Sequence, residues 1–278
     1  MKFKLAILIS VLSAMLLSRL SAQTVVRIES LQITNVGDGQ LYAQLRDSSE
    51  ALLNGKVRIT TGIASEHLDA EFAKGYAENR WSYYHDNELI SYVTYKNGYL
   101  EGECGELFAN GIPQEIGFYR AGKKDGIWKL FNSNGSLKLS EEYVEGDKRK
   151  QISYYSDGSI RSEANFLSGE EHGTQKYYDK ESGRLMSEKN FENGKRVGHQ
   201  MQYYPDGDYI QISNYSILGV RDGKYREIYD KDYKLRTEGR YNDGRRDGVW
   251  KYGSKDGKIT KEEKYDKGKL IETKKFEK

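Results

Sequence analysis

The chain has 278 residues, of which 29 are glycine, 23 are tyrosine and only 2 are proline, and 31% of the residues are charged. This bias is unusual for a single compact core and favours a repeat architecture. The formal net charge is only +2. The strongly basic surface that is typical of nucleic-acid binding is therefore missing, and we expect no nucleic-acid partner.

Residues 1–22 predict a secretory signal peptide. The basic start MKFK is followed by the apolar run LAILISVLSAMLL and then by small residues. We expect cleavage after Ala22, so that the mature chain begins at Gln23 with 41 basic and 42 acidic residues. The signal peptide predicts export, so we expect a periplasmic, extracellular or cell-surface protein. A lipoprotein needs a cysteine directly after the cut, and the only cysteine, Cys104, lies far from it, so we expect no lipidation. A single cysteine also excludes an intrachain disulfide, and we expect it to be a packed side chain.

Residues 23–70 lack a clean period and predict an N-terminal cap with a degenerate repeat. Within them, LNGK at residues 53–56 is followed by the strand-like VRIT at residues 57–60. Terminal repeats commonly deviate in this way because they cover an exposed sheet edge. At the other end, residues 269–278 scatter lysines among apolar residues, which favours a protected last edge strand.

Residues 71–278 predict an array of repeats with a period of about 24 residues. An aromatic residue followed by glycine three places later recurs at separations of 23 to 26 residues. In one of these units, an extra residue stands between the aromatic residue and its glycine. The aromatic residues are Phe72, Tyr95, Tyr119, Tyr143, Phe166, Phe191, Tyr215, Tyr241 and Tyr265. A second glycine usually follows four places after the first, but Asn79, Lys150 and Glu272 replace it in three units. Because Lys and Glu tolerate positive φ poorly, we expect those two turns to differ in shape.

Each unit predicts a β-hairpin. A strand rich in aromatic and β-branched residues leads into a dipeptide that favours a type I′ turn. These dipeptides are Asn134–Gly135, Asp157–Gly158, Asp206–Gly207 and Asp256–Gly257. The return strand then alternates, which places Leu235 on the same face as Tyr241. Since one hairpin cannot bury enough apolar surface alone, we predict an all-β fold, an elongated array of serial antiparallel β-hairpin repeats.

The repeat resembles that of the bacterial MORN-repeat variant. The likeness is clearest in YRAGKKDGIWKLF at residues 119–131 and in FENGKRVGHQMQYY at residues 191–204, and it extends over about residues 70–278. Proteins of this kind are similar to the YwqK-type family, which is often grouped with antitoxin or immunity components. The resemblance implies a scaffolding or partner-binding role and supplies no catalytic residues. The signal peptide departs from a cytosolic antitoxin, so an immunity role would operate outside the cytoplasm.

The sequence shows no machinery for catalysis. No nucleophile elbow, phosphate-binding loop or Cys–His pairing occurs. The four histidines have no metal-ligand spacing, although His172 and His199 lie beside repeat glycines. A catalytic carboxylate pair should be singular, whereas the acidic residues here recur with the repeat. We therefore predict no enzyme activity, no cofactor and no metal site.

The best candidates for partner binding are aromatic and basic residues near the glycine turns. The tryptophans occupy the same place in three units, two residues after the second glycine position, so structural stacking is the first interpretation and interface anchoring the second. The basic residues are either anion-contacting groups or solvated turn charges. The candidates are Trp81, Trp128, Trp250, Lys123, Lys124, Arg245 and Arg246.

We expect a protein partner. The alternative is a glycan or cell-wall polymer, which would require an exposed row of aromatic side chains on the sheet, and a lipid surface is a third interpretation. Because repeated positions build the array, we expect recognition where the chain departs from the repeat. Such departures are the cap, Lys150 and the insertion at Ile217 and Leu218.

Overall fold

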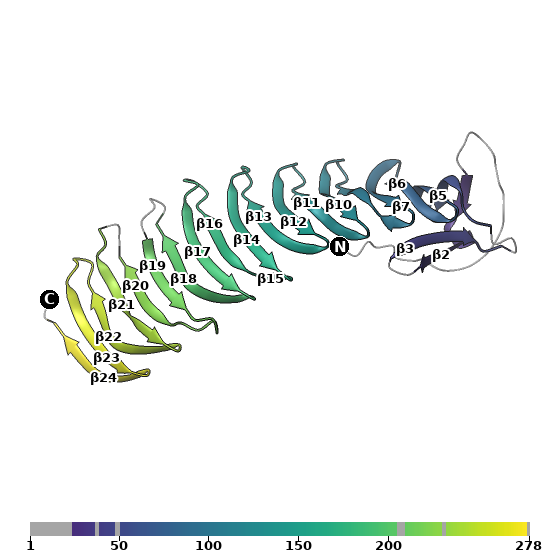
Figure 1. Ribbon diagram of the computed structural model, residues 1–278. Helices are drawn as coiled ribbons and strands as arrows, with labels where there is room; N and C mark the ends of the chain where they lie inside the picture. Colours follow the sequence, from purple (N-terminus) through teal and green to yellow (C-terminus); the bar gives the residue numbers. More distant parts are fainter. Residues whose placement is uncertain (1–23, 37–38, 48–50, 205–208, 230–231, 277–278) are drawn as a thin grey trace. The chain divides into compact units, whose positions relative to one another are not determined.

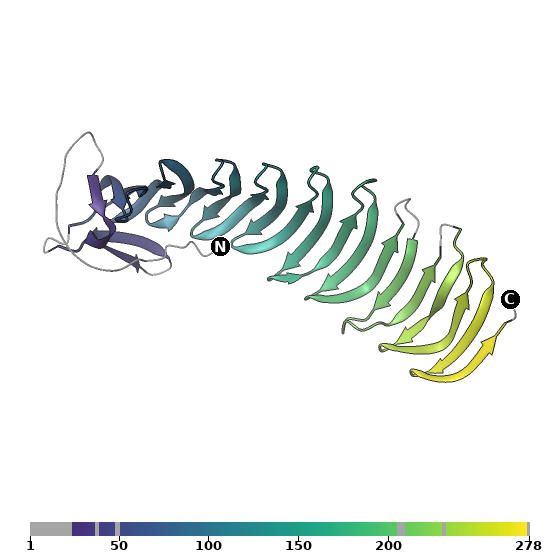
Figure 2. The same ribbon diagram turned by 180° about the vertical axis from the view of Figure 1, so that it is seen from behind.

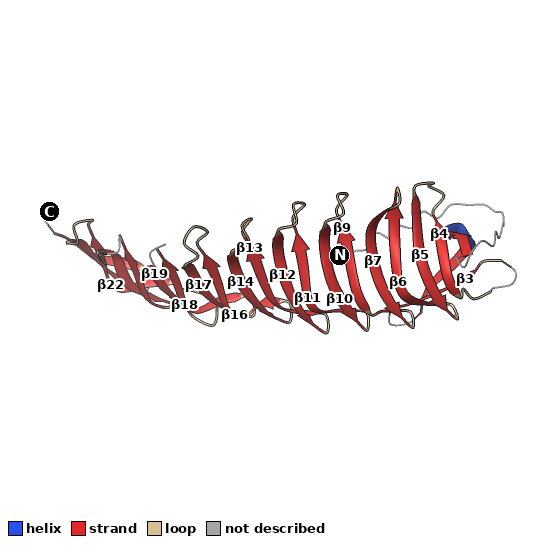
Figure 3. Cartoon of the chain, turned by 90° about the horizontal axis from the view of Figure 1, so that it is seen from above, coloured by secondary structure: helices blue, strands red, loops and turns tan. Residues whose placement is uncertain are grey.

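A computed structural model describes residues 24–36, 39–47, 51–204, 209–229 and 232–276. The predicted signal peptide and the predicted turn at Asp206–Gly207 lie outside these residues. The described chain consists of β-strands joined by turns, with one short 3₁₀ helix, η1 (Ile28–Ser30) (Figure 3). Within these ranges, no helix has the length and apolar character needed to cross a membrane.

Two units make up the chain, unit 1 with residues 1–136 and 143–146, and unit 2 with residues 137–142 and 147–278. The strands of unit 1 are β1 (Thr24–Arg27), β2 (Leu31–Val36), β3 (Gln40–Leu45), β4 (Gly55–Thr60), β5 (Glu66–Ala73), β6 (Tyr76–His85), β7 (Glu88–Lys96), β8 (Tyr99–Leu100), β9 (Gly102–Leu107), β10 (Pro113–Arg120) and β11 (Lys123–Phe131). Strands β4, β5, β6, β7, β9, β10 and β11 pair antiparallel in chain order, and β1 joins β4 in parallel (Figure 1).

Unit 2 continues the same hairpin pattern. Strand β12 (Leu137–Val144) contributes residues to both units. The other strands are β13 (Asp147–Tyr154), β14 (Ile160–Leu167), β15 (Glu170–Glu171), β16 (Gly173–Tyr178), β17 (Leu185–Glu192), β18 (Lys195–Tyr203), β19 (Tyr209–Tyr215), β20 (Gly223–Ile228), β21 (Leu235–Asn242), β22 (Arg245–Gly253), β23 (Ile259–Asp266) and β24 (Lys269–Lys275). From β16 to β24, each strand pairs antiparallel with the next (Figure 2). The all-β prediction of serial antiparallel hairpins is thus confirmed in each unit.

The type I′ turns lie at the other end of the hairpin from the predicted dipeptides. At the turn after eight of the nine closing aromatics, two successive residues have positive φ, for example Ala121 at 46° and Gly122 at 78°. Arg120 pairs with Lys123 across this two-residue loop. This is the backbone geometry of a type I′ hairpin turn. After Tyr215, where the chain has an inserted residue, only Gly219 has positive φ, at 80°. The Tyr-x-x-Gly signature is therefore the tight turn of the repeat.

The prediction of type I′ turns at Asn134–Gly135, Asp157–Gly158 and Asp256–Gly257 is wrong. Only the glycine of each pair has positive φ, 84° at Gly135. The N–H of Asn132 donates to the carbonyl of Ser136, and the N–H of Gly135 donates to the carbonyl of Asn132, both at 2.9 Å. The loop thus has three residues, and the glycine takes the left-handed position at its end.

The prediction for the second glycine is confirmed. Asn79 replaces glycine with φ at 56°, in the left-handed region, as at Gly198 with φ at 60°. Lys150 and Glu272 do not have positive φ. Their side chains disfavour the left-handed conformation, and in the unit with Glu272 the strand still shifts register between Leu270 and Glu272.

Bulges interrupt the strict alternation that was predicted for the return strands. In β21, Thr237 pairs with Glu227 whereas Leu235 pairs with Ile228, so the partner strand advances one residue while β21 advances two. The alternation that holds from Thr237 to Tyr241 does not extend to Leu235. The same shift occurs in β17 and β23.

Strands β2 and β3 form a separate hairpin that covers the first repeats. The N–H of Leu41 donates to the carbonyl of Gly98 and that of Ala43 to the carbonyl of Gly75, both at 2.8 Å. Leu31 and Ala43 are buried in the same apolar cluster as Trp81. The hairpin therefore supplies a second layer over one face of β5 and β6.

Candidate binding surface

The residue two places after the second glycine, here named the stacking position, points into the core. Trp128 and Trp250 at this position are fully buried and Trp81 is nearly so. The ring centroids of Tyr119 and Trp128 lie 5.0 Å apart, and those of Tyr241 and Trp250 lie 4.9 Å apart. The rings of these tryptophans are core rings, which leaves no exposed indole as an anchor for a partner.

Each of two tryptophans covers a glycine on the preceding strand. A Cβ atom added to Gly117 would overlap the indole of Trp128, and one added to Gly239 would overlap that of Trp250. Both glycines lie two residues before the closing aromatic, at what is here named the facing position. The facing position on the preceding strand must therefore be small next to Trp128 and Trp250.

The indole N–H groups are also satisfied within the fold. The Nε1 atoms of Trp81, Trp128 and Trp250 donate to the backbone carbonyl of the residue ten places earlier, at 3.0, 3.1 and 3.2 Å. A buried indole needs such a partner. The sheet face that carries the stacking position is named the stacking face from here on.

The basic candidates divide into exposed and covered residues. Lys123 and Arg245 are exposed. The Nζ atom of Lys124 lies 3.6 Å from the ring centroid of Trp128, and the guanidinium carbon of Arg246 lies 4.4 Å from that of Trp250. Lys124 and Arg246 thus lie over the tryptophans that the sequence placed beside them, where cation–π attraction stabilises both.

Those two covered cations have carboxylate partners. The Nζ atom of Lys124 lies 3.3 Å from a carboxylate oxygen of Glu115, and a guanidinium nitrogen of Arg246 lies 3.9 Å from Glu263. Lys148 follows the same pattern, 3.3 Å from Glu141. These cations are neutralised within the fold and offer little net charge to a ligand.

Unit 2 places glutamines where other repeats have tryptophan. Gln175 and Gln200 occupy the stacking position and are only 3% and 7% exposed. The Nε2 atom of Gln200 donates to the carbonyls of Asn190 and Val197, at 3.1 and 2.9 Å. Asn190 lies ten residues earlier, so the amide replaces the indole N–H at its acceptor. The sequence carried this signal as a polar residue in an apolar repeat position, and our sequence analysis missed it.

A pocket of about 190 Å³ opens beside Gln200 on the stacking face of unit 2. It is formed by β17, β18, β19 and the start of the next repeat, and its floor includes buried polar atoms. Among the described residues, the Oε1 atom of Gln200 and the Oγ atom of Ser187 have no hydrogen-bond partner. Such unpaired buried groups cost about 1–3 kcal/mol each. The pocket is lined by Ser187, Lys189, Arg196, Gln200, Met201, Gln202, Gln211, Ser213, Tyr215 and Arg221.

The charge of this pocket is positive because its facing positions lack the carboxylate that two other repeats have there. Glu141 and Glu263 occupy the facing position in their units, but the pocket has Lys189 and Ser213 there. Among the residues that the structure describes, Lys189, Arg196 and Arg221 form no ion pair with a carboxylate, in contrast to Lys148 and Arg246. Three cations thus share one hollow without an internal counter-ion.

Tyr215 and Tyr241 hold one of these cations in place. The Nε atom of Arg221 lies 3.4 Å from the hydroxyl oxygen of Tyr215, and an Nη atom donates to the hydroxyl of Tyr241 at 3.1 Å. Burial acts to raise the pKa of Tyr215, but hydrogen bonding and charge from Arg221 and Arg196 outweigh it and lower that pKa from its ordinary value of 10.0. The direction of the shift agrees with a local excess of positive charge.

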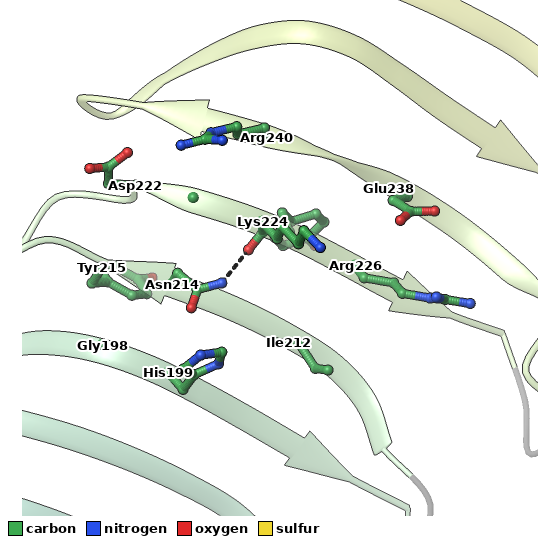
Figure 4. A pocket seen from close by; sticks show the side chains of 12 residues that line it. Gly198, His199, Ile212, Asn214, Tyr215, Asp222, Lys224, Arg226, Glu238 and Arg240 are labelled. Carbon is green, nitrogen blue, oxygen red and sulfur yellow. Dashed lines mark hydrogen bonds between the residues drawn. The ribbon is translucent and has the colours of Figure 1, made fainter.

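A second hollow, of about 600 Å³, lies over strands β18 to β21 and includes residues of the opposite face such as His199 and Asn214. Figure 4 shows its side chains spread along the strands, with Asp222 toward one end, Glu238 and Arg226 toward the other, and Lys224 and Arg240 between them. The Nδ2 atom of Asn214 donates to the carbonyl of Lys224 at 2.6 Å. Its charges are mixed and do not converge on one point, so it defines a site less sharply than the stacking-face pocket.

The described residues contain no cluster of three or more His, Cys, Asp or Glu side chains that could hold a metal ion. Cys104 occupies a stacking position and is 1% exposed. Burial raises the pKa of its thiol to about 12, so the thiolate that reacts with electrophiles is scarce at neutral pH. The prediction that Cys104 is a packed side chain is confirmed.

Two segments of the chain, residues 124–145 and 150–167, match the family model of the MORN repeat variant. These two segments are similar to the MORN repeat variant. The match includes Lys124 and Glu141, whereas Gly146 and Lys148 lie between the two matched segments, and it supports the resemblance that the repeat signature indicated. No curated protein matches the chain.

Proposed function

We propose that the chain is an exported, non-catalytic repeat scaffold that binds a protein partner. The MORN-type match supports this, because such repeats are generally modules for protein or membrane interaction. The antitoxin or immunity role that the resemblance implied is a finer form of the same proposal. It requires that the partner be a toxin whose activity this chain blocks outside the cytoplasm.

The observation that carries the proposal is the exposed turn between β19 and β20. Ile217 and Leu218 are 77% and 67% exposed, the highest values among the large hydrophobic side chains of the described residues. They form the insertion that departs from the repeat, and Tyr215 and Arg221 of the stacking-face pocket flank them. Apolar side chains that protrude beside polar groups are typical of a protein interface.

The glycan alternative lacks the feature that it requires. In the part of the chain that the structure describes, the exposed aromatic side chains are Tyr177 in β16, Tyr233 in the loop before β21 and Phe276 after β24. A sugar-binding platform needs aromatic rings in a row. The covered rings of the stacking face therefore favour a protein partner over a glycan.

A capture experiment with paired variants tests the function. The purified chain from Gln23 is immobilised and exposed to extracts of its source cells and, in parallel, to insoluble cell-wall material. The variant I217D/L218D removes the apolar turn, and I63D, at a residue that is exposed in unit 1, serves as the control. We expect one protein to bind the wild-type chain and I63D at a fixed ratio and to be lost from I217D/L218D.

Two results would count against the proposal, one against protein binding and one against the immunity role. Retention of all three chains on wall material, with no protein captured, would reject the protein-binding proposal and favour the glycan alternative. A captured protein is then assayed for toxicity with and without the chain. Inhibition of that toxicity is the expected result for an immunity role, and unchanged toxicity rejects that role alone.

A further inference from the structure

The stacking-face pocket of unit 2 brings together three cations, two unpaired polar atoms and the inserted turn. Lys189 of β17, Arg196 of β18 and Arg221 of the segment before β20 line it, none with an ion pair among the described residues. Gln200 and Ser187 present unpaired polar atoms at its floor. The inserted turn at Ile217–Leu218 lies next to it in the chain.

We propose that this pocket binds the side-chain carboxylate of an acidic segment in the protein partner. The inference rests on the proposed function, because the segment belongs to that partner. Arg196 and Lys189 supply charge-assisted hydrogen bonds to the carboxylate, and Arg221 adds to the positive field. An arginine fork matches the two oxygens of a carboxylate, which makes this pairing stronger than one between neutral groups.

The fold already contains a carboxylate in the corresponding place of a later repeat. Glu263, at the facing position of β23, accepts hydrogen bonds from the Nζ atom of Lys261 at 2.8 Å and from the hydroxyl groups of Tyr252 and Tyr265 at 2.7 and 2.8 Å. Arg246 lies 3.9 Å from the same carboxylate. The pocket keeps the equivalent arginine and tyrosine, Arg196 and Tyr215. It has Ser213 in place of Glu263 and Gln211 in place of Lys261, and its other two cations, Lys189 and Arg221, come from different positions. A carboxylate from outside would restore the arrangement.

The floor of the pocket favours a peptide over a simple anion. Both N–H bonds of the Gln200 amide are used on backbone carbonyls, so its free group is the Oε1 atom, which as an amide oxygen only accepts hydrogen bonds. A backbone N–H of a peptide can meet this acceptor beside the acidic side chain, whereas inorganic phosphate offers mainly acceptors. The volume of about 190 Å³ suits one side chain rather than a large headgroup.

Peptide binding is measured by fluorescence anisotropy with a short, end-capped, fluorescein-labelled glutamate peptide and the full mature chain. The test variants are K189Q and R196Q. The matched control is K195Q, since Lys195 is an exposed neighbour of Arg196 that does not line the pocket. We expect each test variant to weaken binding about tenfold and the control to change it less than about twofold.

Two further probes identify the chemistry. A glutamine peptide of equal length should not bind, and inorganic phosphate at the concentration of the glutamate peptide should not displace it. Displacement by phosphate, an equal loss in K195Q, or no binding of the glutamate peptide overturns the proposal. Circular dichroism confirms that K189Q and R196Q are folded, and because Arg196 is exposed, R196Q keeps the test valid if K189Q unfolds.

The capture experiment separates this inference from the proposed function. If the wild-type chain captures a protein but does not bind the glutamate peptide, the carboxylate site is rejected and the scaffold function stands. If neither a protein nor the peptide binds, both are rejected. If the peptide binds and K189Q also loses the captured protein, the pocket is part of the partner interface.

Discussion

The stacking face differs between β5–β7 of unit 1 and β17–β20 of unit 2. In the first region Phe72 and Trp81 lie under the β2–β3 hairpin, which contributes Leu31 and Ala43 to a closed apolar cluster. In the second region Gln200 and Ser213 are buried polar residues beside three cations. One repeat frame thus supports both a sealed core and a polar pocket, depending on which residues fill the stacking and facing positions.

The largest expected effect compares the two stacking positions directly. Trp81→Ala should lower the free energy of unfolding by about 3–5 kcal/mol, because it leaves a cavity in a covered cluster. Gln200→Ala should cost only about 1 kcal/mol, since it loses two hydrogen bonds but also removes an unpaired carbonyl. Urea unfolding followed by circular dichroism measures both values. Equal costs would show that the two regions do not differ in packing.

A smaller change in the free energy of unfolding is expected when the facing position no longer fits the tryptophan at the stacking position. Gly239→Ala should destabilise the chain by about 1–3 kcal/mol, because its Cβ atom overlaps the indole of Trp250. In the background of Trp250→Ala the same change should cost almost nothing. A double-mutant cycle from urea unfolding tests this coupling. Additive costs would mean that the glycine is required for another reason.

The smallest expected effect is on the pH dependence of stability and concerns the carboxylate of Glu263 in unit 2. Hydrogen bonds from Lys261, then from Tyr252 and Tyr265, lower the pKa of Glu263 from 4.5 to about 2. The folded state therefore binds fewer protons than the unfolded state, so this contribution to stability is present above pH 4.5 and is lost as the pH falls toward 2. Glu263→Gln should flatten the loss of stability over that range, and Glu262→Gln should not. Urea midpoints at a series of pH values provide the measurement.

The sequence predicted those parts of the fold that depend on local backbone conformation. The aromatic-x-x-Gly spacing located the hairpins because a tight turn needs positive φ at fixed intervals. It also predicted correctly that Lys150 and Glu272 would leave that conformation. The type I′ turn was assigned to the wrong end because Asn-Gly favours both two-residue and three-residue loops. The pairing of the flanking strands, which no dipeptide encodes, decides between them.

The binding surface was less accessible to sequence reasoning. Basic residues beside the tryptophans drew attention, but Lys124 and Arg246 are neutralised by Glu115 and Glu263. The pocket depends on residues that only the register between β17, β18 and β19 brings together. The contact of β3 with Gly98 spans more than fifty residues and follows no period. Of the residues that line the pocket, only Gln200 could be recognised from the sequence, as a polar residue in an apolar repeat position.

The placement of the tryptophans gives the protein a built-in spectroscopic probe of each unit. Trp81 and Trp128 belong to unit 1 and Trp250 to unit 2, and all three indoles are buried. Buried indoles emit at shorter wavelengths than solvated ones. Replacing Trp250 by phenylalanine restricts the emission to unit 1, and replacing the other two restricts it to unit 2. The loss of order in either unit can then be followed separately, without an added label.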